Sequence, residues 1–180
     1  NIMSQIYTVK RLDSMAFEWQ LKEIELTEKY DLENYNISQT YSQISSYYIN
    51  TNQPEKALEA LKKADATAYS PTQKISVQLE YVNYYSKFGD MQAAEKILNE
   101  CKTAFDQDKR LWSIKKRLYN IEYVYYLQSK QYPKALEAAK KQEAEELNFS
   151  ESIQNSVHYL TKGKIYSNMG NMSEAIKYLQ

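Results

Sequence analysis

The sequence predicts an all-α protein that folds as a right-handed α-solenoid of antiparallel helix pairs. A tyrosine and an alanine nine positions later recur five times along the 180 residues. The pairs are Tyr7/Ala16, Tyr48/Ala57, Tyr85/Ala94, Tyr126/Ala135 and Tyr166/Ala175. Successive alanines are 41, 37, 41 and 40 residues apart, a period typical of stacked helical pairs. The chain has only 3 Gly and 3 Pro, which favours long helices with short connections.

The turn residues predict where the helices begin and end. Gly89 and Gly170 suit the left-handed residue that follows a helix, and Pro54 and Pro133 suit the first turn of the next one. After a first helix that ends near residue 9, the predicted helices span residues 13–29, 33–51, 54–68, 71–88, 91–105, 109–129, 133–147, 151–169 and 172–180.

The helices are expected to pair into the units of one repeat domain. Ser70 and Asp108 are the predicted N-caps of two of the longer helices. The predicted units are residues 1–30, 33–69, 71–106, 109–148 and 151–180. Tyr48, Tyr85 and Tyr126 are expected to be largely buried against the alanines of the following helices. The last helix is shorter than its counterparts, so we expect the chain to be a fragment of a longer one.

Composition argues against several classes of function. The 23 basic and 23 acidic residues cancel, which disfavours nucleic-acid binding. The basic clusters at residues 109–110 and 115–117 are interpreted as a solvated helix face. No stretch of 18 or more apolar residues occurs, so we expect no membrane segment here.

The residue inventory also predicts that the chain is not an enzyme and holds no metal or cofactor. Its one histidine, His158, has no Cys or carboxylate at a spacing that fixes a catalytic partner, and a packing role is favoured. Cys101 is expected to be a buried structural thiol. The two residues cannot form a Cys/His metal cluster, and the three glycines are too far apart for a phosphate-binding loop.

The repeated pattern resembles the tetratricopeptide repeat, in which an aromatic residue and a tyrosine on the first helix face alanine and large apolar residues on the second. The second unit matches best: Tyr41, Tyr48, Ala57, Leu61 and Ala64 fill these places. Two later units depart from it, because Glu122 and Lys162 stand where an apolar residue is expected. Either the register slips there or those helices are more exposed.

The resemblance implies a protein or peptide partner that binds along a concave face lined by the first helix of each unit. Amide side chains can hold an extended peptide because they donate and accept hydrogen bonds at once. The candidate groove residues are Asn50, Asn83, Lys87, Asn120, Gln128, Lys164 and Asn168. The alternative is that these are ordinary exposed polar residues.

The tyrosine-rich, glycine-poor style is similar to the repeat regions of sensor-regulators from the Bacteroides group, in which the repeats precede a membrane helix and a signalling domain. This similarity implies the sensor or interaction region of a larger signalling or transcriptional regulator. It implies a periplasmic location, with a cytoplasmic one as the alternative. The alternative function is a structural scaffold for self-association, for instance as a homodimer, or for complex assembly.

Overall fold

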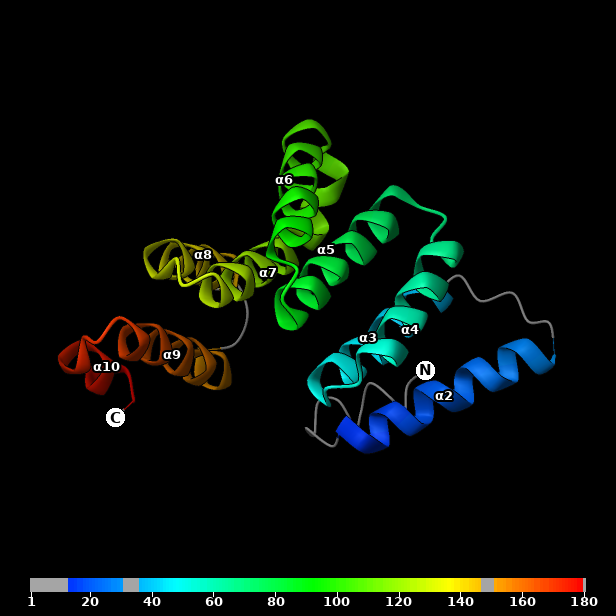
Figure 1. The fold of residues 1–180 in the computed structure, drawn as a ribbon, viewed down its shortest axis with the longest axis horizontal. Helices are drawn as coiled ribbons and strands as arrows, with labels where there is room; N and C mark the ends of the chain where they lie inside the picture. Colours follow the sequence, from blue (N-terminus) through cyan, green and yellow to red (C-terminus); the bar gives the residue numbers. More distant parts are fainter. Residues whose placement is uncertain (1–12, 31–35, 147–150, 180) are drawn as a thin grey trace. The chain divides into compact units, whose positions relative to one another are not determined.

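A computed structural model describes residues 13–30, 36–146 and 151–179 of the chain (Figure 1). Their secondary structure consists of nine α helices and one 3₁₀ helix, so the all-α prediction is confirmed for these residues. The predicted end of a first helix near residue 9 lies outside them. The chain forms two compact units, Asn1–Tyr84 and Tyr85–Gln180.

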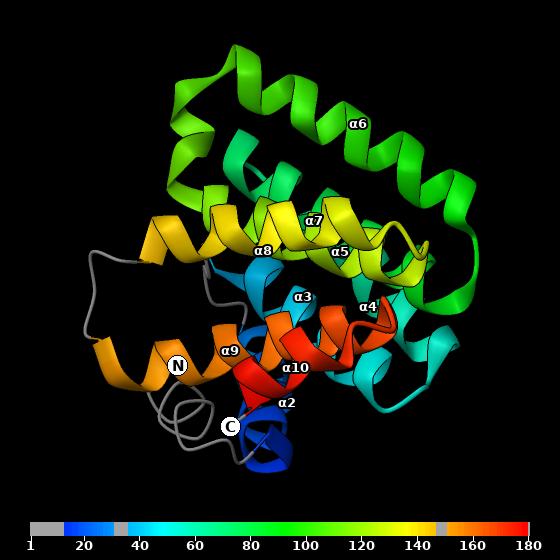
Figure 2. The same ribbon diagram turned by 90° about the vertical axis from the view of Figure 1, so that its left-hand side faces the viewer.

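Helices that follow one another in sequence pack as pairs. The first unit holds α2 (Asp13–Lys29), α3 (Ile37–Asn50), α4 (Pro54–Thr67) and most of α5 (Pro71–Phe88). The second holds α6 (Met91–Gln107), the 3₁₀ helix η1 (Lys109–Ile114), α7 (Lys115–Gln128), α8 (Tyr132–Glu146), α9 (Glu151–Asn168) and α10 (Met172–Leu179). Helix α3 packs along α4, α7 along α8, and α9 along α10, which Figures 1 and 2 show as hairpins.

The start of one helix differs from the prediction. The stretch expected to be helical from residue 109 begins as the 3₁₀ helix η1, and α7 starts only at Lys115. The Leu111 N–H donates to the Asp108 carbonyl at 3.1 Å, a bond between residues three apart that tightens the first turn. Asp108 caps this turn, since its Oδ1 accepts from the Arg110 N–H at 2.9 Å. Ser70 is confirmed as a cap, because its Oγ accepts from the Gln73 N–H at 3.2 Å.

In the described turns that follow Tyr48, Tyr85, Tyr126 and Tyr166, a left-handed residue stands four positions after the tyrosine. Gly89 and Gly170 take it as predicted, with φ of 98° and 75°. Asn52 and Lys130, which the sequence did not single out, take it with φ of 60° and 59°. Residues other than glycine rarely adopt this conformation, so the backbone at Lys130 is strained.

The alanines of the five Tyr/Ala pairs are all buried. Each is at most 4% exposed, and three of them are fully buried. Their tyrosine partners were expected to be largely buried, but Tyr48, Tyr85 and Tyr126 are only half-buried. The reason is visible at Tyr48: its ring packs edge-on against Phe17, and Lys56 Nζ lies 5.5 Å from the ring centroid. A tyrosine ring can pack in this way while its hydroxyl end stays near water.

Both interpretations offered for Glu122 and Lys162 are wrong. The two residues hold their register and are buried, at 5% and 8% exposure. Each is compensated by an ion pair to the preceding helix: Lys102 Nζ lies 2.8 Å from Glu122 Oε1, and Lys162 Nζ lies 2.6 Å from Glu143 Oε2. A buried charge is tolerated when it is paired in this way.

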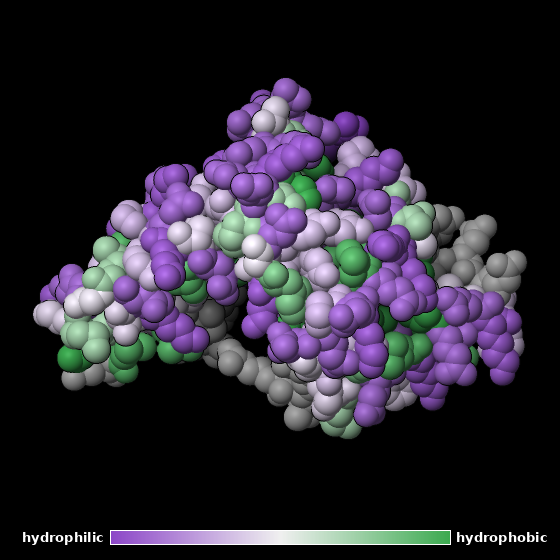
Figure 3. Space-filling view, viewed as in Figure 1, coloured by the Kyte–Doolittle hydropathy of each residue, from purple (hydrophilic) through white to green (hydrophobic). Residues whose placement is uncertain are grey.

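Helix α10 packs closely on α9 and exposes an apolar face. A Cβ on Gly163 would lie 2.6 Å from Leu179 side-chain atoms, so a larger residue at position 163 would require the Leu179 side chain to shift. Met172, Ile176 and Leu179 are each more than half exposed, and Figure 3 shows hydrophobic side chains gathered over α10. Within the described ranges, no helix is both long enough and apolar enough to cross a membrane.

Candidate functional site

The predicted groove residues all lie on the first helix of a pair. Asn83 is half-buried and the others are exposed. By helix, they are Asn50 on α3, Asn83 and Lys87 on α5, Asn120 and Gln128 on α7, and Lys164 and Asn168 on α9. Among the described side chains, no hydrogen bond or ion pair joins any two of the five that belong to the second unit. Their role in binding remains a prediction.

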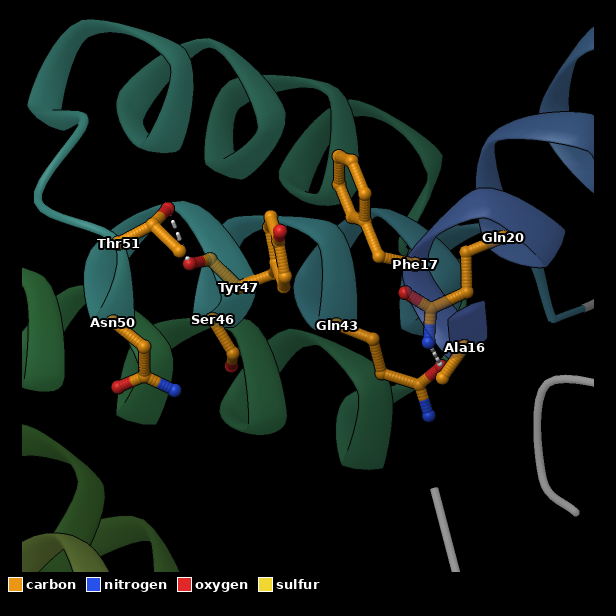
Figure 4. A pocket seen from close by; sticks show the side chains of 8 residues that line it. All are labelled: Ala16, Phe17, Gln20, Gln43, Ser46, Tyr47, Asn50 and Thr51. Atoms are coloured by element: carbon orange, nitrogen blue, oxygen red, sulfur yellow. Dashed lines mark hydrogen bonds between the residues drawn. The ribbon is translucent and has the colours of Figure 1, made fainter. Parts of the chain in front are cut away.

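In the first unit, Asn50 contributes to the wall of a cavity between α2 and α3. Its volume is about 360 Å³. The described residues that line it are Ala16, Phe17 and Gln20 from α2, Gln43, Ser46, Tyr47 and Asn50 from α3, and Thr51 (Figure 4). The four α3 residues recur at helical spacing, so one face of α3 forms one wall.

A pair of aromatic rings contributes to this cavity. The Phe17 and Tyr47 rings are stacked, with centroids 4.0 Å apart and an angle of 13° between their planes. Tyr48 meets the Phe17 ring edge-on, at a centroid distance of 5.3 Å. The rings come from two helices and hold one another in place, which gives the cavity a firm apolar surface.

The rest of the cavity is polar and built mainly from amides. Gln20 Nε2 donates to Gln43 Oε1 at 2.8 Å, drawn as a dashed line in Figure 4. Gln20 is 6% exposed, whereas Asn50 is exposed. Gln43, Ser46 and Asn50 point to the same side of α3 (Figure 4). An amide has two donor hydrogens and an acceptor oxygen, so this side offers both kinds of hydrogen bond.

A buried carboxylate links this face of α3 to the candidate groove residue on α5. Glu80 is 3% exposed, and its Oε1 accepts from Ser46 Oγ at 2.6 Å and from Asn83 Nδ2 at 3.0 Å. Hydrogen bonds to a carboxylate are stronger than those between neutral groups. Glu80 therefore holds Ser46 and Asn83, which lie on different helices, in fixed positions.

The titratable groups of the described core are poorly suited to nucleophilic chemistry. Burial, with the nearby Glu100 charge, raises the pKa of the Cys101 thiol to about 12, so the thiolate is scarce at neutral pH. Burial and a hydrogen bond to Glu28 raise the pKa of Tyr41 to about 12. His158 is buried in the helix packing. The described residues include no group of three or more His, Cys, Asp or Glu placed to hold a metal ion.

Sequence reasoning missed most of the cavity wall. Phe17, Tyr47 and Gln43 fall outside the positions that the repeat resemblance marks for binding. Gln20 did carry a signal, because it stands four residues after Ala16, where the pattern has a large apolar residue. Glu80 carried a weaker one, since it precedes Asn83 by three residues on one helix face.

Comparison with known proteins identifies the family. A family model described as 26S proteasome subunit RPN7 matches residues 8–140, which is most of the chain. The chain belongs to this RPN7 family. A second model, described as tetratricopeptide repeat, matches residues 159–180 of this RPN7-family chain. A search of curated proteins finds no match.

Solved structures with the same fold support the repeat architecture. BtubC (BKLC) from P. vanneervenii has a TM-score of 0.59 and 14% identity, over 98% of this chain and 74% of its own. A Podosopora anserina structure, described as kinesin light chain nearly identical TPR-like repeats, has a TM-score of 0.51 and 18% identity to this chain. The match covers 98% of this chain and 87% of that one. The MamA protein has a TM-score of 0.50 and 19% identity, over 98% and 84%. The RPN7-family chain is thus an α-solenoid with repeats of the tetratricopeptide type, which is in general a non-catalytic protein-interaction fold.

Proposed function

We propose that this chain is a non-catalytic module that binds an extended segment of a protein partner on a face formed mainly by the first helices of its repeats, to which α2 also contributes. The α2–α3 cavity would be the central contact. The observation that carries this proposal is the combination of stacked rings, from Phe17 and Tyr47, with the amides of Gln20, Gln43 and Asn50 around one cavity.

The chemistry of this wall matches an extended peptide. A peptide presents alternating N–H and C=O groups, and amide side chains can pair with both. Aromatic rings supply large contact areas at little cost in conformational entropy, and they are frequent at interface hot spots. The fixed positions of Ser46 and Asn83 around Glu80 favour binding, because little ordering would remain to be done when a partner arrives.

The remaining candidates would extend this face along the solenoid. Lys87, Asn120, Gln128, Lys164 and Asn168 lie on the first helices of later pairs. In this proposal all five predicted units, from residues 1–30 to 151–180, form one binding domain, and its concave face is the partner surface. No nucleic acid, metal or cofactor takes part.

The wider context has two forms. In the first, the module is the sensor or interaction region of a larger signalling or transcriptional regulator, in the style of the Bacteroides-group proteins, with a periplasmic or a cytoplasmic location. In the second, it is a scaffold for complex assembly or self-association, for instance as a homodimer. Membership of a family described by a proteasome subunit favours complex assembly. Light scattering would test for self-association, since the measured mass of a self-associating scaffold rises with protein concentration.

A peptide selection tests the proposed binding face. A random peptide library displayed on phage is selected against the chain, and enriched peptides are titrated against variants by fluorescence anisotropy. Gln43→Ala and Asn50→Ala should each weaken binding about fivefold to thirtyfold, because each removes a partner of the peptide backbone. Gln39→Ala is the matched control, since Gln39 is an exposed amide of α3 that does not line the cavity. If the two cavity variants bind like this control, the proposal is wrong.

A further inference from the structure

The α2–α3 cavity contains a pair of amides whose hydrogen-bonding groups are only partly used. Gln20 is 6% exposed, and its Nε2 donates to Gln43 Oε1 at 2.8 Å. Among the described residues, nothing donates to Gln20 Oε1 and nothing accepts from Gln43 Nε2. On the basis of the peptide-binding function proposed above, we propose that this pair selects a partner segment by the carboxamide side chain of a glutamine or an asparagine.

Gln20 Oε1 can be reached from the cavity. Gln20 lines the cavity although it is almost fully buried. Among the described residues, Ser86 Oγ is the one fully enclosed side-chain oxygen or nitrogen that lacks a hydrogen-bond partner. The unpaired Gln20 oxygen is therefore open, and Figure 4 shows it turned toward the side of Phe17 and Tyr47. An open acceptor of this kind is satisfied by water or by a ligand that donates a hydrogen.

A carboxamide group matches the two unused groups. Its NH₂ can donate to Gln20 Oε1 while its oxygen accepts from Gln43 Nε2. The match does not depend on which way the two glutamine amides are turned, because turning both leaves one oxygen and one NH₂ group unused. The end of a side chain can reach the buried Gln20, whereas a backbone amide is held back by the residues on either side of it. Exposed Asn50 stays available for the backbone of the same segment.

The described lining disfavours charged side chains and purely apolar ones. It includes no carboxylate, ammonium or guanidinium group, so an ionised side chain would lose its hydration without gaining a counter-charge. A carboxylate also has no hydrogen to donate to Gln20 Oε1. A methionine would fill the same space as a glutamine but would leave that oxygen without a partner, which is costly for a buried acceptor.

The size and the rings of the cavity favour a flat side chain. A volume of about 360 Å³ is near the lower limit of small-ligand pockets, about 300–1,000 Å³, and has room for one or two side chains. The stacked rings of Phe17 and Tyr47 form its apolar surface. A glutamine can lay its methylene groups and its planar carboxamide against such rings while its polar atoms meet the amide pair.

The test is a competition between four phage libraries, with the whole chain as bait. Each library displays short random peptides without Asn or Gln, except at a central position that is fixed as Gln, Asn, Glu or Met. The Gln library, the Asn library or both should be recovered about tenfold or more over the other two, because two hydrogen bonds distinguish them. One peptide from the favoured library is then titrated by fluorescence anisotropy, and its Glu and Met versions should bind about tenfold or more weakly.

A double variant should reverse the preference. Gln20→Met/Gln43→Met replaces both amides with apolar side chains of similar size, a change that is nearly neutral for folding because neither partner is left unpaired. The Met library should then be recovered about threefold or more over the Gln library. Gln39→Met/Gln92→Met is the matched control, since it changes two exposed glutamines that do not line the cavity, and it should keep the original preference. Circular dichroism melts check that both variants fold.

The outcomes separate carboxamide selection from peptide binding. If peptides are recovered but the Glu or Met library equals the other two, or if the original preference survives in the folded double variant, carboxamide selection is wrong while peptide binding stands. The titration of the Gln, Glu and Met peptides against the original chain decides the same question without any variant. If no library is enriched over a selection without bait, the proposed peptide-binding function fails, and carboxamide selection fails with it.

Discussion

The same structural position is apolar in one unit of this chain and charged in the other. In the first unit, Ile24 and Ile44 lie in one buried cluster. Ile24 follows Ala16 by eight residues, and Ile44 precedes Tyr48 by four. The second unit has two such junctions between successive repeats. The two places hold Lys102 and Glu122 where α6 meets α7, and Glu143 and Lys162 where α8 meets α9. Each of these two pairs is joined by an ion pair. At these three junctions between successive repeats the two places hold complementary partners, which are apolar in one case and oppositely charged in the other two.

The two charged junctions also differ from one another. The preceding helix supplies the cation in the Lys102–Glu122 pair and the anion in the Glu143–Lys162 pair. Exchanging partners between the junctions would set two lysines or two glutamates against each other. The reversal thus favours the observed order of helices over a slipped one, which two identical apolar junctions would not do.

The largest expected effect comes from truncating the apolar junction. Ile44→Ala should destabilise the chain by about 3–4 kcal/mol, because Ile44 is only 4% exposed and its loss leaves a cavity. Urea unfolding followed by circular dichroism would measure this. Leu21→Ala is the control, since Leu21 is exposed on α2 and its truncation should cost under about 0.5 kcal/mol. Equal losses for the two variants would mean that the Ile24/Ile44 junction is not a core contact.

Removing one charge from the second unit should cost somewhat less. Lys102→Met leaves the Glu122 carboxylate buried without its cation, which should cost about 2–3 kcal/mol. The lower end of the usual range is expected because the Lys102 side chain is 39% exposed, and water can compensate in part. Lys96→Met, at an exposed lysine of the same helix, should leave the urea midpoint nearly unchanged. A similar midpoint for both variants would show that the ion pair contributes little.

Converting the charged junction into the apolar one sharpens the comparison. The free energy of unfolding of the double variant Lys102→Ile/Glu122→Ile should lie within about 1 kcal/mol of that of the original chain, because the variant removes both desolvated charges at once. The two single substitutions should each be clearly destabilising, with a coupling energy of about 1–3 kcal/mol in the double-mutant cycle. Additive losses would contradict the idea that the two places act as one complementary pair.

The turns of the two units provide a smaller test. The α3–α4 turn places Asn52 in the left-handed region, and the α7–α8 turn places Lys130 there. Lys130→Gly should stabilise the chain by about 0.5–1 kcal/mol, because glycine adopts this conformation without strain. Asn52→Gly should gain less, since asparagine tolerates the left-handed region better than lysine does. The melting temperatures of the two variants would show which substitution stabilises more. A Lys130→Gly chain less stable than the original would argue against strain at this turn.

The smallest effect concerns alkaline pH. Burial lowers the pKa of the Lys102 ammonium, but its hydrogen bond to Glu122 and the charges of Glu122 and Tyr126 outweigh this, so the pKa lies above its ordinary value of 10.5. The folded chain therefore holds this proton more tightly than the unfolded chain. This contribution to stability is complete below the ordinary value and is lost as pH rises through the raised pKa. The difference in urea midpoint between the original chain and Lys102→Met should stay constant up to about pH 10 and shrink as the pH rises above 10.5, by an amount worth less than about 1 kcal/mol. A difference in urea midpoint that stays constant over this pH range would contradict a raised Lys102 pKa.

The sequence by itself determined the repeat architecture. The Tyr/Ala spacing, Gly89, Gly170 and the capping Ser70 specify helices and turns through local geometry, which does not depend on distant residues. The predicted bounds of α5 match the structure for this reason. The alanine of each pair is buried as expected, because a small side chain lets two helices pack closely.

Only the tertiary structure decided how the exceptions to the pattern are resolved. Glu122 and Lys162 look misplaced in the sequence, since their partners Lys102 and Glu143 lie about twenty residues away on another helix. The cavity walls are of the same kind: Phe17 stacks on Tyr47, and Glu80 joins Ser46 to Asn83, across helices whose relative rotation no local pattern specifies. Helical periodicity determines which residues share a face of one helix. The packing of neighbouring helices determines which faces meet, and therefore which polar groups converge to form a site.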